Sequence, residues 1–271
     1  MGYAFTGLDS AQRQLLTTRY GDPPATGAGE VEIQLFRAPR DAFLPLASDR
    51  RTYAFDLEHS RCRLCLAGFR FAAIVDLTST RLVASLWIAD PGHGFLSIVA
   101  NLLRTLVAYC SLARGGVLLH SAGVVWAGKA RLFVGQSGAG KSSLARLALH
   151  RGLEVLSDDL NAIHSHDGRP HVTGLPFTGD LGTAGCTARG TYPLAGLYCL
   201  QRKDSDALEP ISLATAFASV LGCSPFLNHD PHRVGDLMKL LDRLLDNVPR
   251  AGLSFRLDGR VWDLLDAEPS S

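Results

Sequence analysis

The sequence has little lysine, little methionine and no excess of charge. Of its 271 residues, four are Lys and two are Met, and 27 basic residues face 26 acidic ones, for a formal net charge of +1. A balanced chain with no stripe of Lys and Arg gives no sign of steering toward nucleic acid, so we expect no nucleic-acid partner. An apolar content of 46% excludes a mostly disordered chain. Because Lys is scarce, a Lys inside a motif carries more weight.

The features of a secreted or membrane-spanning protein are also missing. The first residues lack the basic region, apolar run and cleavage site of a secretory signal. The longest apolar stretch, Phe95 to Ala113, is interrupted by Asn101 and Arg104, and its apolar residues recur at helical spacing. That pattern predicts a buried helix rather than a membrane span. We therefore expect a cytoplasmic protein with no membrane partner.

The six cysteines do not form a metal-binding framework. Cys62 and Cys65 make a CxxC, but no second close pair of Cys or His accompanies them. The surrounding residues are typical of a strand, on which positions i and i+3 face opposite sides. We expect reduced, structural cysteines, with a metal or redox role as the alternative.

The chain changes character near residue 92. Before it, short alternating segments predict strands of a small β-rich N-terminal subdomain, 1–92, with a flexible start that ends in a Pro- and Gly-rich linker at 21–27. After it, strands and helices alternate, which predicts an α/β domain over 93–271. Strands are expected at 31–35, 52–55, 69–71, 117–120, 124–126, 131–134 and 153–156, a turn at 90–94, a hairpin turn at Ala127-Gly128, a helix at 141–151, a loop at 164–192 and a final leucine-lined helix around 237–245.

One motif carries chemistry. Gly135-Gln136-Ser137-Gly138-Ala139-Gly140-Lys141-Ser142 fits the phosphate-binding pattern G-x-x-x-x-G-K-S/T, followed by Ser143. Glycines let successive backbone N–H groups turn toward phosphate oxygens, and the helix that follows presents its positive end to the same anion. In such a loop Lys141 reaches the β- and γ-phosphates, and the Ser142 hydroxyl binds Mg²⁺. The motif predicts nucleotide binding at 135–143, with ATP and Mg²⁺ as cofactors.

The rest of the sequence reduces the number of reactions that a protein with this loop could catalyse. The sequence has no LSGGQ segment, which an ABC ATPase needs, and no N-K-x-D guanine reader, which a GTPase needs. Asp158 and Asp159 end the strand that follows the motif helix, and His120 ends an apolar strand before it. If the strand at 153–156 lies beside the motif strand, the two carboxylates open next to the phosphates. One could then hold Mg²⁺ while the other accepts a proton from an attacking hydroxyl.

Together these elements resemble the HPr kinase/phosphorylase family and its wider relatives. The resemblance rests on His120, on the loop GQSGAGKS and on the segment HRGLEVLSDDLNAI, with His120 twenty-one residues before Lys141 and the two Asp seventeen and eighteen after it. It implies an α/β fold with a P-loop kinase core of the HPr kinase and phosphoenolpyruvate carboxykinase type. It also implies that Lys141 binds phosphate, that Ser142 and Asp158 hold Mg²⁺, that Asp159 is the general base and that His120 lies near the γ-phosphate.

The chain also departs from the family pattern. HPr kinases carry an acidic metal ligand in a Glu-x-Arg-Gly context, whereas the comparable stretch here ends in Arg189-Gly190 without a Glu. Arg189 is a candidate remnant of that signature that binds phosphate. HPr is therefore a less favoured acceptor, and the diverged relatives resemble kinases that tailor lasso peptides. We expect a kinase that phosphorylates a hydroxyl, serine above all, on a peptide or protein. The alternatives are a kinase of free serine and a non-catalytic, nucleotide-gated peptide-binding module.

Some questions stay open from the sequence. The glycine-rich 164–192 segment is a candidate lid over the acceptor. The phosphate donor is ATP by default, with ADP or pyrophosphate as alternatives. The resembling HPr kinases are hexameric, and the sequence leaves homo-oligomerisation of this chain open.

Overall fold

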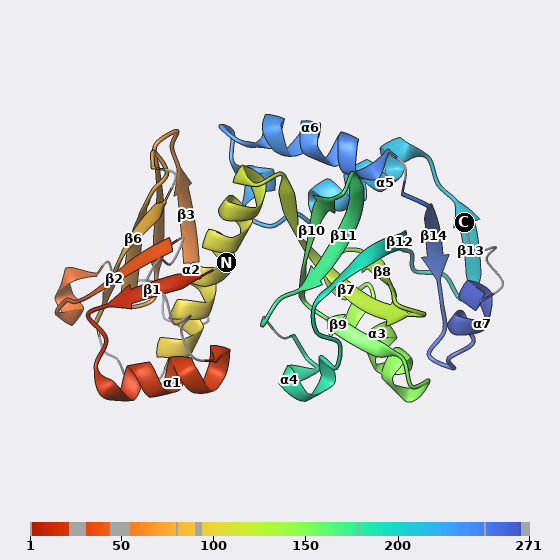
Figure 1. Cartoon of the computed structure of the whole chain (residues 1–271), viewed down its shortest axis with the longest axis horizontal. Helices are drawn as coiled ribbons and strands as arrows, with labels where there is room; N and C mark the ends of the chain where they lie inside the picture. Colours follow the sequence, from red (N-terminus) through yellow and green to blue (C-terminus); the bar gives the residue numbers. More distant parts are fainter. Residues whose placement is uncertain are drawn as a thin grey trace. The chain divides into compact units, whose positions relative to one another are not determined.

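The computed structural model describes residues 2–21, 31–43, 55–79, 81–89, 94–177, 179–246 and 248–266. Over these ranges the chain is a mixed α/β protein with two sheets (Figure 1). It divides into two compact units, Met1–Val107 with Asp230–His232, and Ala108–His229 with Arg233–Ser271. The division into a subdomain at 1–92 and a domain at 93–271 stays a prediction. Most of the linker at 21–27 and of the turn at 90–94 lies outside the described residues.

The first unit is built on a six-stranded sheet. Its strand order is β1-β2-β6-β5-β4-β3. In β2 the side chains of Val31, Ile33 and Leu35 are buried and alternate with more exposed polar ones, which confirms the strand expected there. The unit comprises β1 (Tyr3–Thr6), α1 (Ser10–Tyr20), β2 (Val31–Arg37), a 3₁₀ helix (Arg40–Ala42), β3 (Phe55–His59), β4 (Arg63–Gly68), β5 (Phe71–Asp76), β6 (Leu82–Ile88) and the first part of α2 (Phe95–Ala113).

Two strand expectations in this unit need comment. The prediction of a strand at 69–71 is wrong for its first two residues, because Phe69 and Arg70 form the turn of the β4–β5 hairpin and β5 begins at Phe71. Arg70 adopts a φ of 60°, in the left-handed region that a tight turn requires. Of the strand expected at 52–55, only Phe55 is described, as the first residue of β3.

The apolar helix expected between residues 95 and 113 is present as α2. It is long and apolar enough to span a membrane by length and composition, but 72% of its apolar window is buried inside the structure. Val99, Leu102 and Leu106 are almost fully buried and lie at helical spacing. These are the properties of a core helix, while a cytoplasmic location stays a prediction.

The second unit carries the larger sheet. Its order is β11-β10-β7-β8-β12-β14-β13, and β9 pairs with β7 beside β10. Because β11 also pairs with β12, strands β10, β7, β8, β12 and β11 close into a ring. The unit contains β7 (Gly116–Trp126), β8 (Lys129–Val134), α3 (Lys141–His150), β9 (Glu154–Ser157), β10 (Leu160–His166), β11 (Arg169–Gly174), α4 (Gly182–Gly185), β12 (Thr191–Leu200), β13 (Ala207–Pro210), α5 (Leu213–Gly222), a 3₁₀ helix (Leu227–His229), α6 (Val234–Leu245), β14 (Arg250–Ser254) and α7 (Val261–Asp266).

Strand directions decide which loops meet. β8 is parallel to β12, and β12 is parallel to β14, so the carboxyl ends of these three strands lie at one edge of the sheet. β7 is antiparallel to β8 on one side and to β9 and β10 on the other. The strand at 153–156 therefore does not lie beside the motif strand, and the condition stated for it in the sequence is not met. β7 lies between them.

The hairpin between β7 and β8 has the expected turn. Ala127 and Gly128 both have positive φ, 50° and 73°, as a two-residue turn with right-handed strand twist requires. The expected strands at 117–120 and 124–126 are parts of the single strand β7, so His120 lies within a strand rather than at its end. Beyond the turn, Phe133 of β8 packs with Leu144 of α3 and Trp262 of α7 in the core.

Two expectations about the C-terminal half are wrong in part. The 164–192 segment is not one loop: His164–His166 finish β10, and Arg169–Gly174 form β11. Among the described residues of 175–177 and 179–190, the short helix α4 is the one regular element. The leucine-lined helix is present as α6 with its leucines buried, but β14 and α7 follow it.

Candidate active site

The phosphate-binding motif lies between a buried strand and a helix. β8 ends at Val134, and α3 begins at Lys141 with Gly140 as its N-cap. Gly138 and Gly140 have φ values of 75° and 102°, in the region that L side chains rarely adopt. Residues Gln136, Ser137 and Gly138 are exposed, whereas Ser142 and Ser143 are half-buried in the first turn of α3. The loop is open on its outer side, where a ligand could enter.

Lys141 is folded into the loop that precedes it. Its side chain is 6% exposed, and its Nζ donates to the carbonyl oxygens of Gly135 at 2.8 Å and Gln136 at 3.2 Å. Burial lowers the pKa of Lys141, while the nearby Cys223 and Asp159 act in the opposite direction. A buried ammonium held by carbonyl dipoles is a site for a ligand of several negative charges, such as a polyphosphate.

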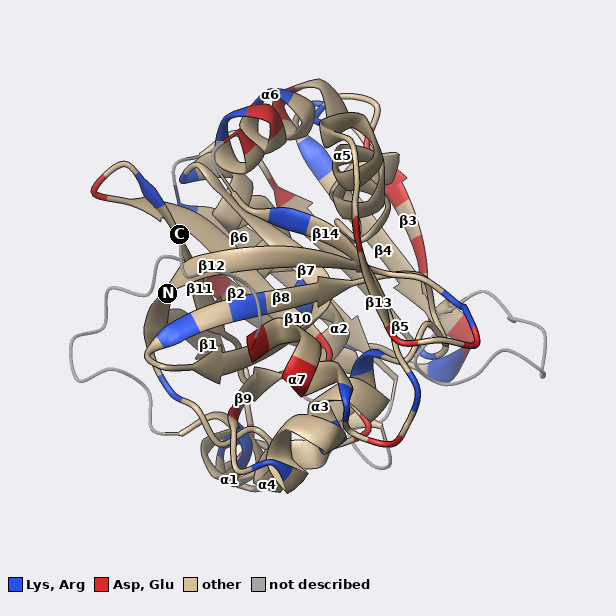
Figure 2. Cartoon of the chain, turned by 90° about the vertical axis from the view of Figure 1, so that its right-hand side faces the viewer, with Lys and Arg blue, Asp and Glu red and all other residues tan. Residues whose placement is uncertain are grey.

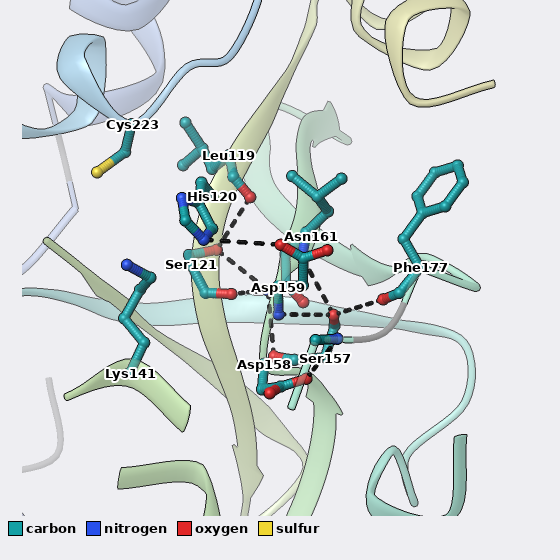
Figure 3. Close-up of polar contacts among 12 residues, drawn as sticks. Leu119, His120, Ser121, Lys141, Ser157, Asp158, Asp159, Asn161, Phe177 and Cys223 are labelled. Atoms are coloured by element: carbon teal, nitrogen blue, oxygen red, sulfur yellow. Dashed lines mark hydrogen bonds and ion pairs between the residues drawn. The ribbon is translucent and has the colours of Figure 1, made fainter. Parts of the chain in front are cut away.

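His120 and Asp159 meet across neighbouring strands. Leu160 at the start of β10 pairs with His120 of β7, and the Ser121 N–H donates to the Asp159 carbonyl at 3.0 Å. His120 Nε2 lies 3.6 Å from Asp159 Oδ1 (Figure 3). The His120 side chain is 42% exposed and that of Asp159 is 19% exposed, so a substrate can reach both.

A hydrogen-bond network fixes the turn that carries Asp159. Ser157 Oγ accepts from the N–H groups of Asp159 and Leu160, both at 3.1 Å, and donates to the Phe177 carbonyl at 3.1 Å. The buried Asn161 donates through Nδ2 to the backbone oxygen of Ser121 at 2.9 Å. Ser157 and Asn161 are positioning residues that the sequence reasoning missed. Their position next to Asp158 and Asp159 in the sequence is the feature that could have identified them.

Asp158 faces away from the Lys141 side of the turn (Figure 3). It is 2% exposed, and its two carboxylate oxygens accept from the N–H groups of Gly179 at 3.0 Å and Leu181 at 3.1 Å. Each of these oxygens keeps a second lone pair that a Mg²⁺ ion could use. Its metal role stays a prediction, and the contacts give it a structural role as the anchor of residues 179–181.

Cys223 is a further residue of the site that no sequence pattern singles out. It follows α5, and its carbonyl accepts the His120 N–H at 2.7 Å. Its thiol donates to the Gly135 carbonyl at 3.6 Å, and burial raises its pKa. The residue therefore links β7 to the start of the phosphate-binding loop as a neutral thiol. No motif connects it with Lys141, eighty-two positions earlier.

The residues present fit a nucleotide phosphate and its Mg²⁺. Among the described residues, no group of three or more His, Cys, Asp or Glu is arranged to hold a metal ion. Mg²⁺ in nucleotide sites is bound through phosphate oxygens, waters and one or two protein oxygens, so it needs no such group. Arg189 is exposed and lies next to Ala188, whose N–H donates to Val155 of β9. Its role in binding phosphate stays a prediction.

Comparisons with known proteins give limited information. No protein-family model matches the chain, and none of the curated proteins matches it. One similar solved structure is that of the Hpr(Ser) kinase/phosphatase from Coxiella burnetii, at 12% identity and a TM-score of 0.30, over 54% of this chain and 90% of that one. So low a TM-score carries no argument about fold or activity. Membership of the HPr kinase family, expected from the motifs, stays a prediction.

The lowered pKa of Lys141 predicts how phosphate binding depends on pH. A neutral Lys141 binds phosphate less well, so affinity for Mg²⁺-ATP should fall as pH rises through that lowered pKa, before the ordinary lysine value of 10.5 is reached. Calorimetric titration across this range would show the loss, accompanied by proton uptake on binding. Affinity that stays constant up to pH 10.5 would contradict the lowered pKa.

The anchoring role of Asp158 predicts a local effect. In Asp158→Ala, residues 179–190 should be cut faster by proteases, and the free energy of unfolding should fall by about 2–4 kcal/mol, because two N–H groups lose a charged acceptor. Asp180→Ala is the matched control, since Asp180 is exposed in the same segment. Equal cutting of both variants, at the wild-type rate, would show that Asp158 does not hold this segment.

Proposed function

We propose that this protein is an ATP- and Mg²⁺-dependent phosphotransferase that phosphorylates a hydroxyl group, serine in particular, on a peptide or protein. The observation that carries the proposal is the grouping of Asp159 with His120 and, through its electrostatic interaction, with Lys141. A phosphate-binding lysine and an accessible carboxylate in one site are the parts that phosphoryl transfer to a hydroxyl needs.

Each residue has a defined part in this chemistry. Lys141 and the N–H groups of the loop bind the phosphates of ATP and stabilise the charge that develops on the transferred group. The acceptor hydroxyl oxygen forms a bond to the γ-phosphorus, the bond from this phosphorus to the β–γ bridging oxygen breaks, and ADP leaves. Asp159 takes the hydroxyl proton. His120 Nε2, 3.6 Å from the Asp159 carboxylate, orients it.

Mg²⁺ would be held by Ser142 together with a carboxylate of the 158–159 turn. When bound, it neutralises phosphate charge and orients the phosphates. Both oxygens of Asp158 accept one backbone N–H group each, so a metal at this residue would use their remaining lone pairs, next to residues 179–181.

The acceptor is proposed from the motif resemblance. A peptide or protein serine is favoured, with lasso-type precursors ahead of HPr, because the Glu of the Glu-x-Arg-Gly context is missing at 187–190. A cytoplasmic location without nucleic-acid or membrane partners belongs to the same proposal.

The role of Asp159 is tested by a conservative substitution. Asp159→Asn should lower the rate of phosphate transfer by about 10²–10⁴-fold, the usual contribution of a general base, and should leave ATP affinity nearly unchanged. The assay incubates the protein with Mg²⁺-ATP and a panel of HPr, serine peptides including lasso-type precursors, and free serine, with mass spectrometry as the readout.

Two further variants make the result decisive. Asp236→Asn, on the exposed side of α6, should behave as wild type, and Lys141→Ala should lose both ATP binding and transfer. Unchanged transfer in Asp159→Asn would show that the base is wrongly assigned. Nucleotide binding by the wild type without any phosphorylated acceptor in the panel would count against the kinase and favour the nucleotide-gated binding module.

A further inference from the structure

Two loops lie beside the phosphate-binding loop on the side away from Asp159. They follow β12 and β14, which are parallel to β8, so the carboxyl ends of all three strands share one edge of the sheet. Ligands of open α/β sheets bind outside such carboxyl ends. His120 and Asp159 belong to β7 and the β9–β10 turn, on the opposite side of β8. The phosphate-binding loop therefore has the proposed base on one side and these loops on the other.

The loop after β12 reaches the phosphate-binding loop through Arg202. The Arg202 guanidinium donates to the Gly138 carbonyl at 2.7 Å. A carbonyl held on the outside of the loop leaves the neighbouring N–H groups free to face inward. The φ of +75° at Gly138 favours glycine, and a Cβ there would displace the Arg202 nitrogen, which would lie 2.9 Å from it. Arg202 is thus a positioning residue for the loop.

The residue after β14, Phe255, places an aromatic ring at the same rim. A Cβ added to Gly140 would lie 3.0 Å from Cζ of Phe255, so the ring is against the last glycine of the motif. One side of Phe255 packs on the core cluster that contains Leu144 and Trp262, yet the residue is only half-buried. The ring is fixed by packing and still offers surface to a ligand.

An ion pair holds the backbone next to this ring. Asp206, before β13, accepts from the N–H of Arg256 at 2.6 Å and from its guanidinium at 2.9 and 3.1 Å. Burial works against it, but these hydrogen bonds and the charge of Arg256 lower the pKa of Asp206. Basic and acidic residues also alternate along the segments around β13 and α7 (Figure 2). The ion pair holds the backbone on the C-terminal side of Phe255.

We infer that the phosphate donor is a nucleoside triphosphate whose base lies on the ring of Phe255, rather than pyrophosphate. The inference rests on the proposed function, because it takes the phosphates to be bound at the motif. In-line transfer requires the acceptor and the leaving group on opposite sides of the transferred phosphorus. With the acceptor at Asp159, the leaving ADP extends toward β12 and β14, where Phe255 lies. A nucleobase stacks well on an aromatic face, whereas pyrophosphate has no group that could use it.

The test compares a donor with a base and a donor without one. Affinities for Mg²⁺-ATP and for inorganic tripolyphosphate with Mg²⁺ are measured by calorimetry on the full chain. Phe255→Leu, which keeps the packing but removes the aromatic face, should weaken ATP binding about tenfold and change tripolyphosphate binding by less than twofold. Phe255→Trp should retain ATP binding. The control Phe36→Leu changes another partly exposed aromatic residue, far along the chain on β2, and should affect neither ligand.

The outcomes separate this inference from the proposed function. Unchanged ATP affinity in Phe255→Leu, or an equal loss for ATP and tripolyphosphate, would overturn the base site while leaving the phosphate site intact. Wild-type protein that binds neither ligand, or Lys141→Ala that still binds both, would overturn the phosphate site itself, and the base site with it.

Discussion

Backbone pairing of β7 on both of its edges is the constraint on which the site depends. One edge pairs with β8, which leads into the phosphate-binding loop, and the other pairs with β9 and β10, whose connecting turn carries Asp159. His120 lies on β7 itself. Because antiparallel pairing fixes register, groups twenty-one residues before and eighteen residues after Lys141 are brought together by the sheet rather than by flexible loops.

The polar residues of the site fall into two groups, buried ones that bind backbone groups and partly exposed ones that solvent can reach. Asp158, Ser157 and Asn161 are buried and satisfy backbone groups of the surrounding turns. Asp159 and His120 are partly exposed and face a buried lysine. Asp158 and Asp159 form the turn between β9 and β10, and their side chains have different partners. Asp158 accepts the N–H groups of Gly179 and Leu181, whereas Asp159 lies beside His120 and is the residue proposed as the base.

Much of this arrangement could be predicted from the sequence. The glycine pattern predicts the loop between strand and helix, and the hairpin at Ala127-Gly128 follows from turn chemistry. The place of β9 could not be predicted, since strand order depends on long-range pairing that periodicity does not encode. The Gly, Thr and Pro content of 164–192 predicts a loop where β11 lies, whereas pairing with β10 and β12 decides its structure. Cys223 is in the site only through tertiary packing.

The central claim is that the γ-phosphate of the donor lies between Lys141 and Asp159. The most direct test is a crystal structure of the protein with Mg²⁺ and a non-hydrolysable ATP analogue. We expect the phosphates along residues 135–142, the γ-phosphate within hydrogen-bond distance of Lys141 Nζ, and Asp159 on the face opposite the leaving group. A γ-phosphate directed away from Asp159, or an analogue bound outside the motif, would contradict it.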